Sequence, residues 1–96
     1  MFPEVIQVLP GDDFTAYVYF ADGQIRLFDA KPLIEAGGVF EQIRDETRFR
    51  ETMTVMNGTL SWDPDGSRNE AKSLDIDPYV IYLESPAARD PLERAM

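Results

Sequence analysis

The sequence contains no cysteine and no histidine. Without cysteine, the chain has no disulfide framework and no thiolate chemistry. Without histidine, it lacks the commonest metal ligand and the commonest general base at neutral pH. Basic residues are scarce as well, because nine Lys and Arg stand against 18 Asp and Glu, for a net charge of −9. Such a chain repels phosphate backbones, so direct nucleic-acid binding is disfavoured.

Long apolar runs are also missing. No segment approaches the ~18 apolar residues of a membrane span. The first ten residues, MFPEVIQVLP, lack the basic and apolar regions of a signal peptide. We therefore expect a cytoplasmic protein that does not enter a membrane. With 96 residues, 44% of them hydrophobic and 28% charged, the chain has the size and balance of one globular domain.

The segment 53–62, MTVMNGTLSW, carries the clearest hairpin signal. Asn57 and Gly58 suit the two central positions of a type I′ turn, in which both residues have positive φ. The resulting register places four apolar residues on one face of the hairpin and its threonines and serine on the other. The apolar residues are Met53, Val55, Leu60 and Trp62.

The segment 14–29, FTAYVYFADGQIRLFD, predicts another hairpin with a two-residue turn at Asp22-Gly23. In this register Val18 faces Leu27 on the core face of the strands. Aromatic residues and arginine, the types enriched at protein interfaces, lie on the opposite face. These residues are Tyr17, Tyr19, Arg26 and Phe28. They are a candidate partner surface, but the favoured interpretation is that the chain's own helices cover them; the third alternative is that they line a ligand groove.

The remaining segments predict one further strand and short helices. Residues 4–10 read as a strand that ends at Pro10-Gly11. Residues 31–38 predict a helix with proline in its first turn and two glycines at its end. A second helix, through Phe49, begins after an N-cap at Asp45.

Residues 74–85, LDIDPYVIYLES, are open to two interpretations. Asp77 suits an N-cap and Pro78 a first helical residue, which favours a short helix. The run YVIY is also typical of a strand. In the helical interpretation one face covers the sheet with Tyr79, Tyr82 and Leu83.

The sequence gives little support to either a calcium-binding site or a catalytic site. Residues 63–73 alternate polar side chains, but the sixth and twelfth positions of the would-be calcium loop hold Arg68 and Leu74 instead of glycine and glutamate. Asp75 and Asp77 have no nucleophile or phosphate loop to act with, so capping is the better account of Asp77. We therefore predict no catalytic residue, no metal site and no cofactor.

The order of these motifs resembles the domain of unknown function 2442 (DUF2442) family of small bacterial and phage proteins. The shared features run from an acidic and aromatic strand to an Asp-Pro segment that ends in tyrosine. In this chain they fall on residues 14–20, Asp22-Gly23, Asp29, Leu33, Gly38-Val39-Phe40, Phe49, Trp62, 75–78 and Tyr82. The resemblance spans residues 3–85 and implies a compact α+β domain without established catalytic residues. It also implies a neighbouring gene for another small protein, in a pairing that looks like a toxin–antitoxin module.

The sequence thus predicts an α+β domain over residues 1–85, with a mostly antiparallel sheet of four or five strands, two β-hairpins and two or three short helices. A C-terminal tail, 86–96, follows it. We expect a non-enzymatic protein-binding module, the antitoxin-like member of a two-protein pair, that binds a protein partner or a second copy of itself. The alternatives are a small-ligand or nucleic-acid-binding regulator and an enzyme of unrecognised type.

Overall fold

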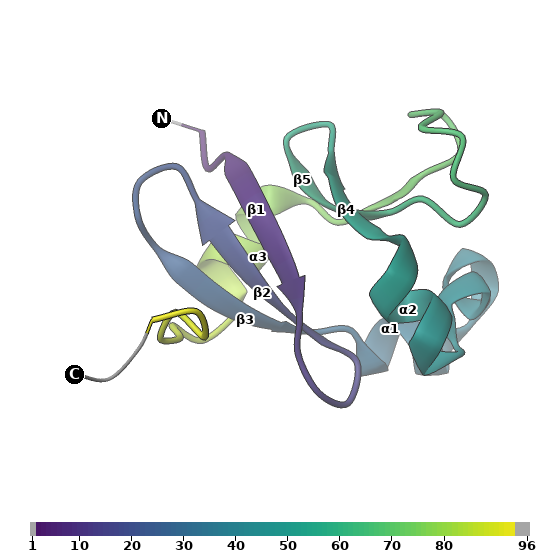
Figure 1. The fold of residues 1–96 in the computed structure, drawn as a ribbon, viewed down its shortest axis with the longest axis horizontal. Helices are drawn as coiled ribbons and strands as arrows, with labels where there is room; N and C mark the ends of the chain where they lie inside the picture. The colour runs from purple at the N-terminus through teal and green to yellow at the C-terminus, as the bar shows by residue number, and fades with distance from the viewer. Residues whose placement is uncertain (1, 94–96) are drawn as a thin grey trace.

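The computed structural model describes residues 2–93, which fold into six strands with three α-helices and one 3₁₀-helix (Figure 1). The strands form two antiparallel sheets of three, ordered β1-β2-β3 and β4-β5-β6. Their bounds are β1 Val5–Pro10, β2 Thr15–Phe20, β3 Ile25–Asp29, β4 Met53–Met56, β5 Thr59–Trp62 and β6 Leu74–Asp75. The α+β prediction is confirmed, whereas the count of four or five strands is wrong. The additional strand, β6, has only two residues and follows a polar loop, so it has no periodicity to read.

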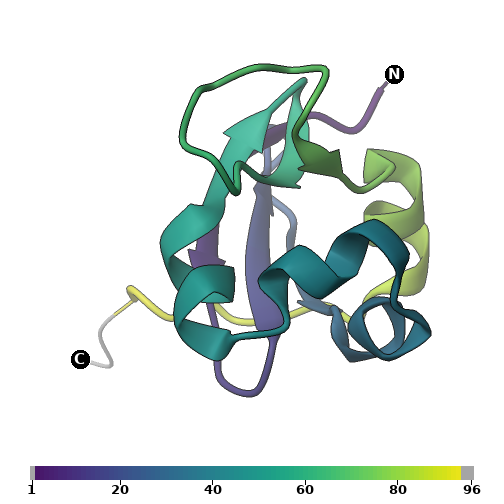
Figure 2. The same ribbon diagram turned by 90° about the vertical axis from the view of Figure 1, so that its right-hand side faces the viewer.

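The helices begin and end at local signals. Their bounds are α1 Lys31–Ala36, η1 (the 3₁₀-helix) Gly38–Ile43, α2 Glu46–Thr52 and α3 Pro78–Glu84. Gly37 ends α1 with a positive φ of 82°, a conformation that favours glycine. The Asp45 carboxylate accepts hydrogen bonds from the backbone N–H groups of Thr47 and Arg48 at the start of α2. In Figure 2 the helical segment 31–52 lies below the second sheet, and α3 lies to the right of that sheet.

One hydrophobic core joins the two sheets. Val18 and Phe20 of β2, Leu60 and Trp62 of β5 and Ile81 of α3 are all essentially inaccessible to solvent. The Trp62 ring lies 5.4 Å from that of Phe49 in α2 and 6.3 Å from that of Phe40 in η1. Burial of several such side chains, worth about 1.5–3 kcal/mol each, holds the helices against the sheets.

The second hairpin has the predicted register. Met53 pairs with Trp62 and Val55 with Leu60, and Asn57 and Gly58 have φ of 55° and 70°. Its polar face, however, is not exposed, because all four residues of the central strand β5 are buried. Thr59 is satisfied there by donating its hydroxyl to the carbonyl of Ile76 at 2.5 Å.

The first hairpin is shifted by one residue from the predicted register. Its loop has three residues, 21–23, because the N–H of Gly23 bonds to the carbonyl of Phe20 and the N–H of Phe20 bonds to that of Gln24. Within this loop only Gly23 has a positive φ, 93°, as in a type I turn followed by a glycine bulge. Val18 therefore pairs with Arg26 instead of Leu27. Because side chains alternate between faces, this shift moves every residue of β3 to the opposite face.

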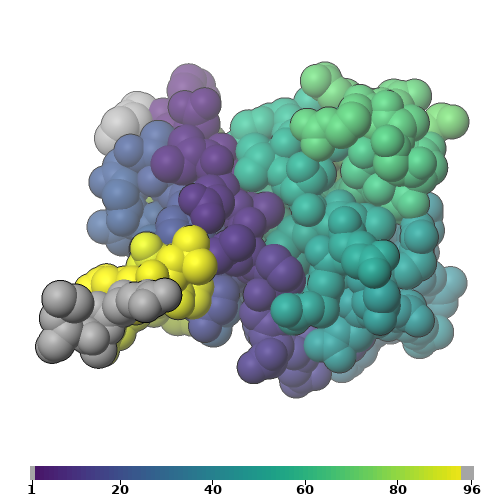
Figure 3. Space-filling view, viewed as in Figure 1, coloured from purple at the N-terminus to yellow at the C-terminus, as the bar shows by residue number. Residues whose placement is uncertain are grey.

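The C-terminal tail adds to the first sheet. The N–H of Leu27 bonds to the carbonyl of Pro86, and the N–H of Ala88 bonds to the carbonyl of Ile25, so residues 86–88 run along the free edge of β3. The Tyr19 hydroxyl then donates to the Asp90 carboxylate at 2.6 Å. Figure 3 shows the described part of the tail, in yellow, on the face opposite to the one that α3 covers in Figure 1.

Candidate functional site

The four residues of the candidate partner surface do not share one face. Tyr17 and Tyr19 lie on the tail side of the first sheet, whereas Arg26 and Phe28 lie on the α3 side with Val18. Phe28 is 8% exposed and belongs to the core. The prediction that these residues form one surface is wrong, because it depended on a two-residue turn at Asp22-Gly23.

Two polar members of that set, Tyr19 and Arg26, are already bound within the chain. Burial, with help from Asp90, raises the pKa of Tyr19 to about 12. The guanidinium of Arg26 lies 5.2 Å from the ring centroid of Tyr82 and donates through Nη1 to the carbonyl of Ser85. The tail and α3 therefore cover parts of both faces of this hairpin.

The start of α3 is where the sequence places it. Asp77 is the N-cap, and its Oδ1 accepts a hydrogen bond from the N–H of Tyr79 at 2.9 Å, while Pro78 is the first helical residue. The orientation of the helix differs from the expected one. Ile81 is fully buried against the sheet, whereas Tyr79 and Leu83 are 41% and 74% exposed.

This orientation creates a groove of about 460 Å³ between three segments that are distant in the sequence. The N-terminal segment 2–4 forms one side, the turn between β2 and β3 forms the second, and α3 forms the third. The lining residues are Phe2, Pro3, Glu4, Phe20, Ala21, Asp22, Tyr79, Tyr82 and Leu83. The N–H of Ala21 bonds to the carbonyl of Glu4 at 2.8 Å, which ties the N-terminal segment to the turn.

Two aromatic pairs build the walls of the groove. Phe20 and Tyr82 meet edge to face, with ring centroids 4.9 Å apart and planes at 88°. Phe2 and Tyr79 do the same at 6.1 Å and 73°. Phe20 is buried and anchors its pair, whereas Phe2 is 81% exposed. The groove is therefore an open, largely apolar concavity, the usual form of a binding site.

Two polar groups of the groove, the Asp22 carboxylate and the Tyr82 hydroxyl, are hydrogen-bonded to each other, and the bond shifts the pKa of both. The Tyr82 hydroxyl donates to Oδ2 of Asp22 at 2.5 Å, and the N–H of Gln24 donates to Oδ1 at 2.9 Å. The bond from Tyr82 lowers the pKa of the Asp22 carboxyl, and the same bond raises the pKa of the Tyr82 phenol. At neutral pH Asp22 is thus a carboxylate and Tyr82 a neutral phenol, and neither group is tuned to exchange a proton.

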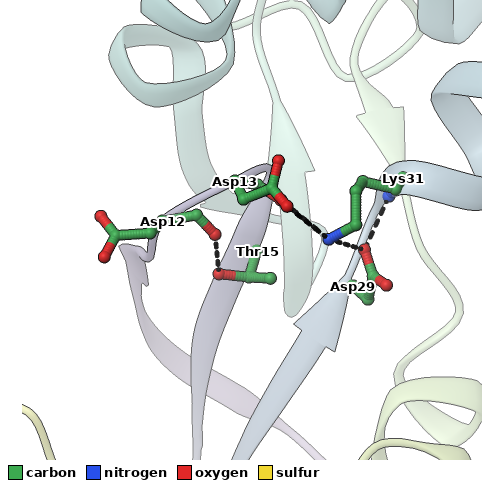
Figure 4. A network of polar contacts seen from close by, with 5 residues as sticks. All are labelled: Asp12, Asp13, Thr15, Asp29 and Lys31. Carbon is green, nitrogen blue, oxygen red and sulfur yellow. Dashed lines mark hydrogen bonds and ion pairs between the residues drawn. The ribbon is translucent and has the colours of Figure 1, made fainter.

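A second polar cluster lies at the other end of the first sheet (Figure 4). The ammonium of Lys31 is 3.0 Å from the Asp29 carboxylate and 3.4 Å from that of Asp13, and it also donates to the carbonyl of Asp13. Asp13 and Phe14 both have positive φ, 56° and 61°. Because the lysine is fully engaged in fastening this strained loop to the start of α1, the cluster is a structural clamp.

Three arginines in or beside α2, at 44, 48 and 50, are each bound within the chain. Arg44 is 3.7 Å from the Glu41 carboxylate, but Arg48 donates to the carbonyl of Pro64 and Arg50 to that of Gly11. Two of the three therefore fasten α2 to loops by hydrogen bonds to backbone. Within residues 2–93 no group of three or more acidic side chains is arranged to hold a metal ion.

Sequence reasoning missed the groove because its three sides are unrelated in the sequence. Tyr79 and Leu83 were assigned to the covered face of the helix, and the N-terminal segment was read only as the approach to a strand. The single signal available was the pair of bulky residues Phe2-Pro3 before β1.

The fold and the groove define a small α+β domain with an aromatic concavity that is lined in part by carboxylates. The chain belongs to the DUF2442 family, described as "Protein of unknown function (DUF2442)", whose model matches residues 5–87. The resemblance inferred from the motif order is thereby confirmed. Comparisons with curated proteins and with solved structures gave no significant match. None of the helices in residues 2–93 has the length and apolar character needed to cross a membrane.

Proposed function

We propose that this protein is a non-enzymatic protein-binding module that docks a partner chain in the groove between residues 2–4, the β2–β3 turn and α3. The observation that carries the proposal is the exposure of large apolar side chains around one concavity. Phe2 and Leu83 are 81% and 74% exposed, and Tyr79 is 41% exposed beside them. Apolar side chains gathered in this way are typical of interaction sites, and covering them gains about 25 cal/mol per Å² of apolar surface.

The chemistry of the groove supports binding without catalysis. Its ionisable pair, Asp22 and Tyr82, has pKa values that move away from neutrality in opposite directions. A general acid or base works best when its pKa is close to the working pH. The groove therefore offers shape and charge, and its hydrogen-bonded pair is not prepared for proton transfer.

Charge supports a different protein as the partner in preference to a second copy. Two copies would bring together chains of net charge −9 each. The groove itself carries Glu4 and Asp22 and no lysine or arginine among its lining residues. Self-repulsion of this kind favours monomers. The finer interpretation, an antitoxin-like member of a two-protein pair, rests on the family resemblance alone.

The test compares capture of partners by the tagged protein and by a groove variant, in cells that naturally produce it. Tyr79→Gln/Leu83→Gln removes two exposed apolar side chains and retains good helix-forming residues. Val39→Gln/Leu92→Gln is the matched control, because Val39 and Leu92 are 59% and 63% exposed outside the groove.

We expect a protein that the wild type and the control capture equally and that the groove variant loses, and the purified pair should reproduce this difference by calorimetry. Equal capture by all three forms would contradict docking in the groove. A wild-type protein that sediments as a dimer, with the groove variant monomeric, would replace the partner by a second copy.

A further inference from the structure

The groove combines apolar walls with an anionic mouth, which is formed by Glu4 and Asp22. Phe20 is buried at its wall, whereas Glu4 and Asp22 are exposed. The hydrogen bond between the N–H of Ala21 and the carbonyl of Glu4 holds the two acidic residues near each other. Among residues 2–93 no basic side chain lines the groove, and Arg26, outside the lining, makes only a minor contribution to the lowered pKa of Asp22.

We propose that the groove recognises a lysine or arginine side chain of the partner protein, an inference that rests on the proposed function. Both side chains are amphipathic, with an aliphatic stem that packs on apolar surface and a charged head that stays near polar groups. The stem would lie along the aromatic walls, and the head would meet Glu4 and Asp22. A cation close to aromatic rings also gains from the negative potential of the ring faces.

Apolar, acidic and aromatic side chains are expected to bind in the groove less well than lysine or arginine. A purely apolar side chain would bring the two carboxylates out of water without a partner, which costs free energy. An acidic side chain would be repelled by them. A bulky aromatic side chain would fill the space but would leave the charge of the mouth uncompensated.

The chain itself contains an example of the contact. The guanidinium of Arg26 lies 5.2 Å from the ring centroid of Tyr82, a groove residue, and its Nη1 is held by the carbonyl of Ser85. The Tyr82 ring therefore already packs against a cation. Arg26 is held at the end of α3, and within residues 2–93 it forms no ion pair with Asp22, although its charge contributes to the lowered pKa of that carboxyl.

The test is a titration of ¹⁵N-labelled protein, followed by NMR, with three peptides that differ only at the central residue: acetyl-Gly-Ser-Xaa-Ser-Gly-amide with Xaa arginine, leucine or glutamate. The arginine peptide should shift the amides of residues 20–22 and 79–83, with the leucine peptide about fivefold weaker and the glutamate peptide without effect. Raising the salt concentration should weaken the arginine peptide only.

Two matched variants test whether Glu4 and Asp22 cause the preference for the arginine peptide. Glu4→Gln/Asp22→Asn should weaken the arginine peptide about fivefold, and asparagine can still accept the turn hydrogen bond from Gln24. Asp12→Asn/Glu35→Gln removes the same charge from exposed positions outside the groove and should leave the affinity unchanged. Glu4→Gln alone changes a side chain that makes no hydrogen bond to the turn, and it should give an intermediate loss of affinity for the arginine peptide.

Several outcomes would overturn this inference. They are equal binding of the leucine and arginine peptides, an unchanged affinity in the Glu4→Gln/Asp22→Asn variant, and no shift with any peptide. Tighter binding of tetramethylammonium chloride than of the arginine peptide would also overturn it, in favour of a small-molecule cation. Each of these results leaves docking in the groove standing if partner capture still depends on Tyr79 and Leu83. Conversely, the proposed function fails only if that dependence is lost.

Discussion

The hydroxyl of Tyr82 and the carboxylate of Asp22, 60 residues apart in the sequence, form a hydrogen bond of 2.5 Å. This bond joins α3 to the turn between β2 and β3, and so closes one side of the groove. It also sets the ionisation of both groups, because it lowers the pKa of Asp22 and raises the pKa of Tyr82.

Replacing Tyr82 by phenylalanine should raise the pKa of Asp22 toward its ordinary value, because the largest cause of its lowering is removed. In the wild type the lowered pKa means that Asp22 adds stability above its unfolded pKa, and this contribution is lost as the pH falls through the folded pKa. The raised pKa of Tyr82 has the opposite sign: its contribution is complete below the unfolded pKa and is lost as the pH rises through the folded pKa. Carboxyl ¹³C shifts of Asp22 measured against pH check the first effect. An unchanged titration midpoint in Tyr82→Phe would refute the coupling.

Asp90→Asn should lower the pKa of Tyr19 from about 12, because the hydrogen bond and charge of Asp90 add to the effect of burial. Tyr19 stabilises the fold fully below its unfolded pKa, and this contribution is lost as the pH rises through the folded value. The substitution should also increase hydrogen exchange at the amide of Ala88, which bonds to β3. Ultraviolet titration of tyrosine ionisation and exchange mass spectrometry measure the two effects. Asp65→Asn, in the polar loop, is the control that should change neither.

The register of the first hairpin predicts a large difference between two aromatic residues of adjacent strands. Phe28→Ala should cost about 3–5 kcal/mol, because Phe28 is 8% exposed in the core. Tyr17→Ala should cost clearly less, since its side chain is half-exposed on the tail side of the sheet. Denaturant melts decide the matter. Equal losses of stability in the two variants would indicate that Phe28 lies on the same face as Tyr17, as a two-residue turn requires.

Gly11→Ala should destabilise the protein by about 1–3 kcal/mol through overpacking. A Cβ at this position would overlap with Oγ1 of Thr15, which is held by a hydrogen bond to the carbonyl of Asp12. Thr15→Ala in the same chain removes the obstructing atom, so the double variant should lose less than the sum of the two single variants. Thermal melts of the four proteins test this, and strict additivity would show that the clash is not the cause.

Where local chemistry admits one answer, the sequence predicts the structure correctly. Asn57 and Gly58 both adopt positive φ, as a two-residue type I′ loop requires. That loop in turn determines the register of β4 and β5. Asp77 and Pro78 start α3 in the same way, because a capping side chain and a fixed proline φ act within one turn of backbone. The order of these local signals was also enough to indicate the family.

Local chemistry was not enough at Asp22-Gly23, because this pair suits both a two-residue turn and a three-residue turn with glycine in the bulge. The choice between them shifts β3 by one residue and separates Tyr17 from Phe28, and the packing of Phe28 in the core agrees with only one choice. In α3, likewise, the sequence determines where the helix starts, but burial of Ile81 determines which side faces the sheet. The groove depends on both choices, since its sides come from three distant segments that only the packed core brings together.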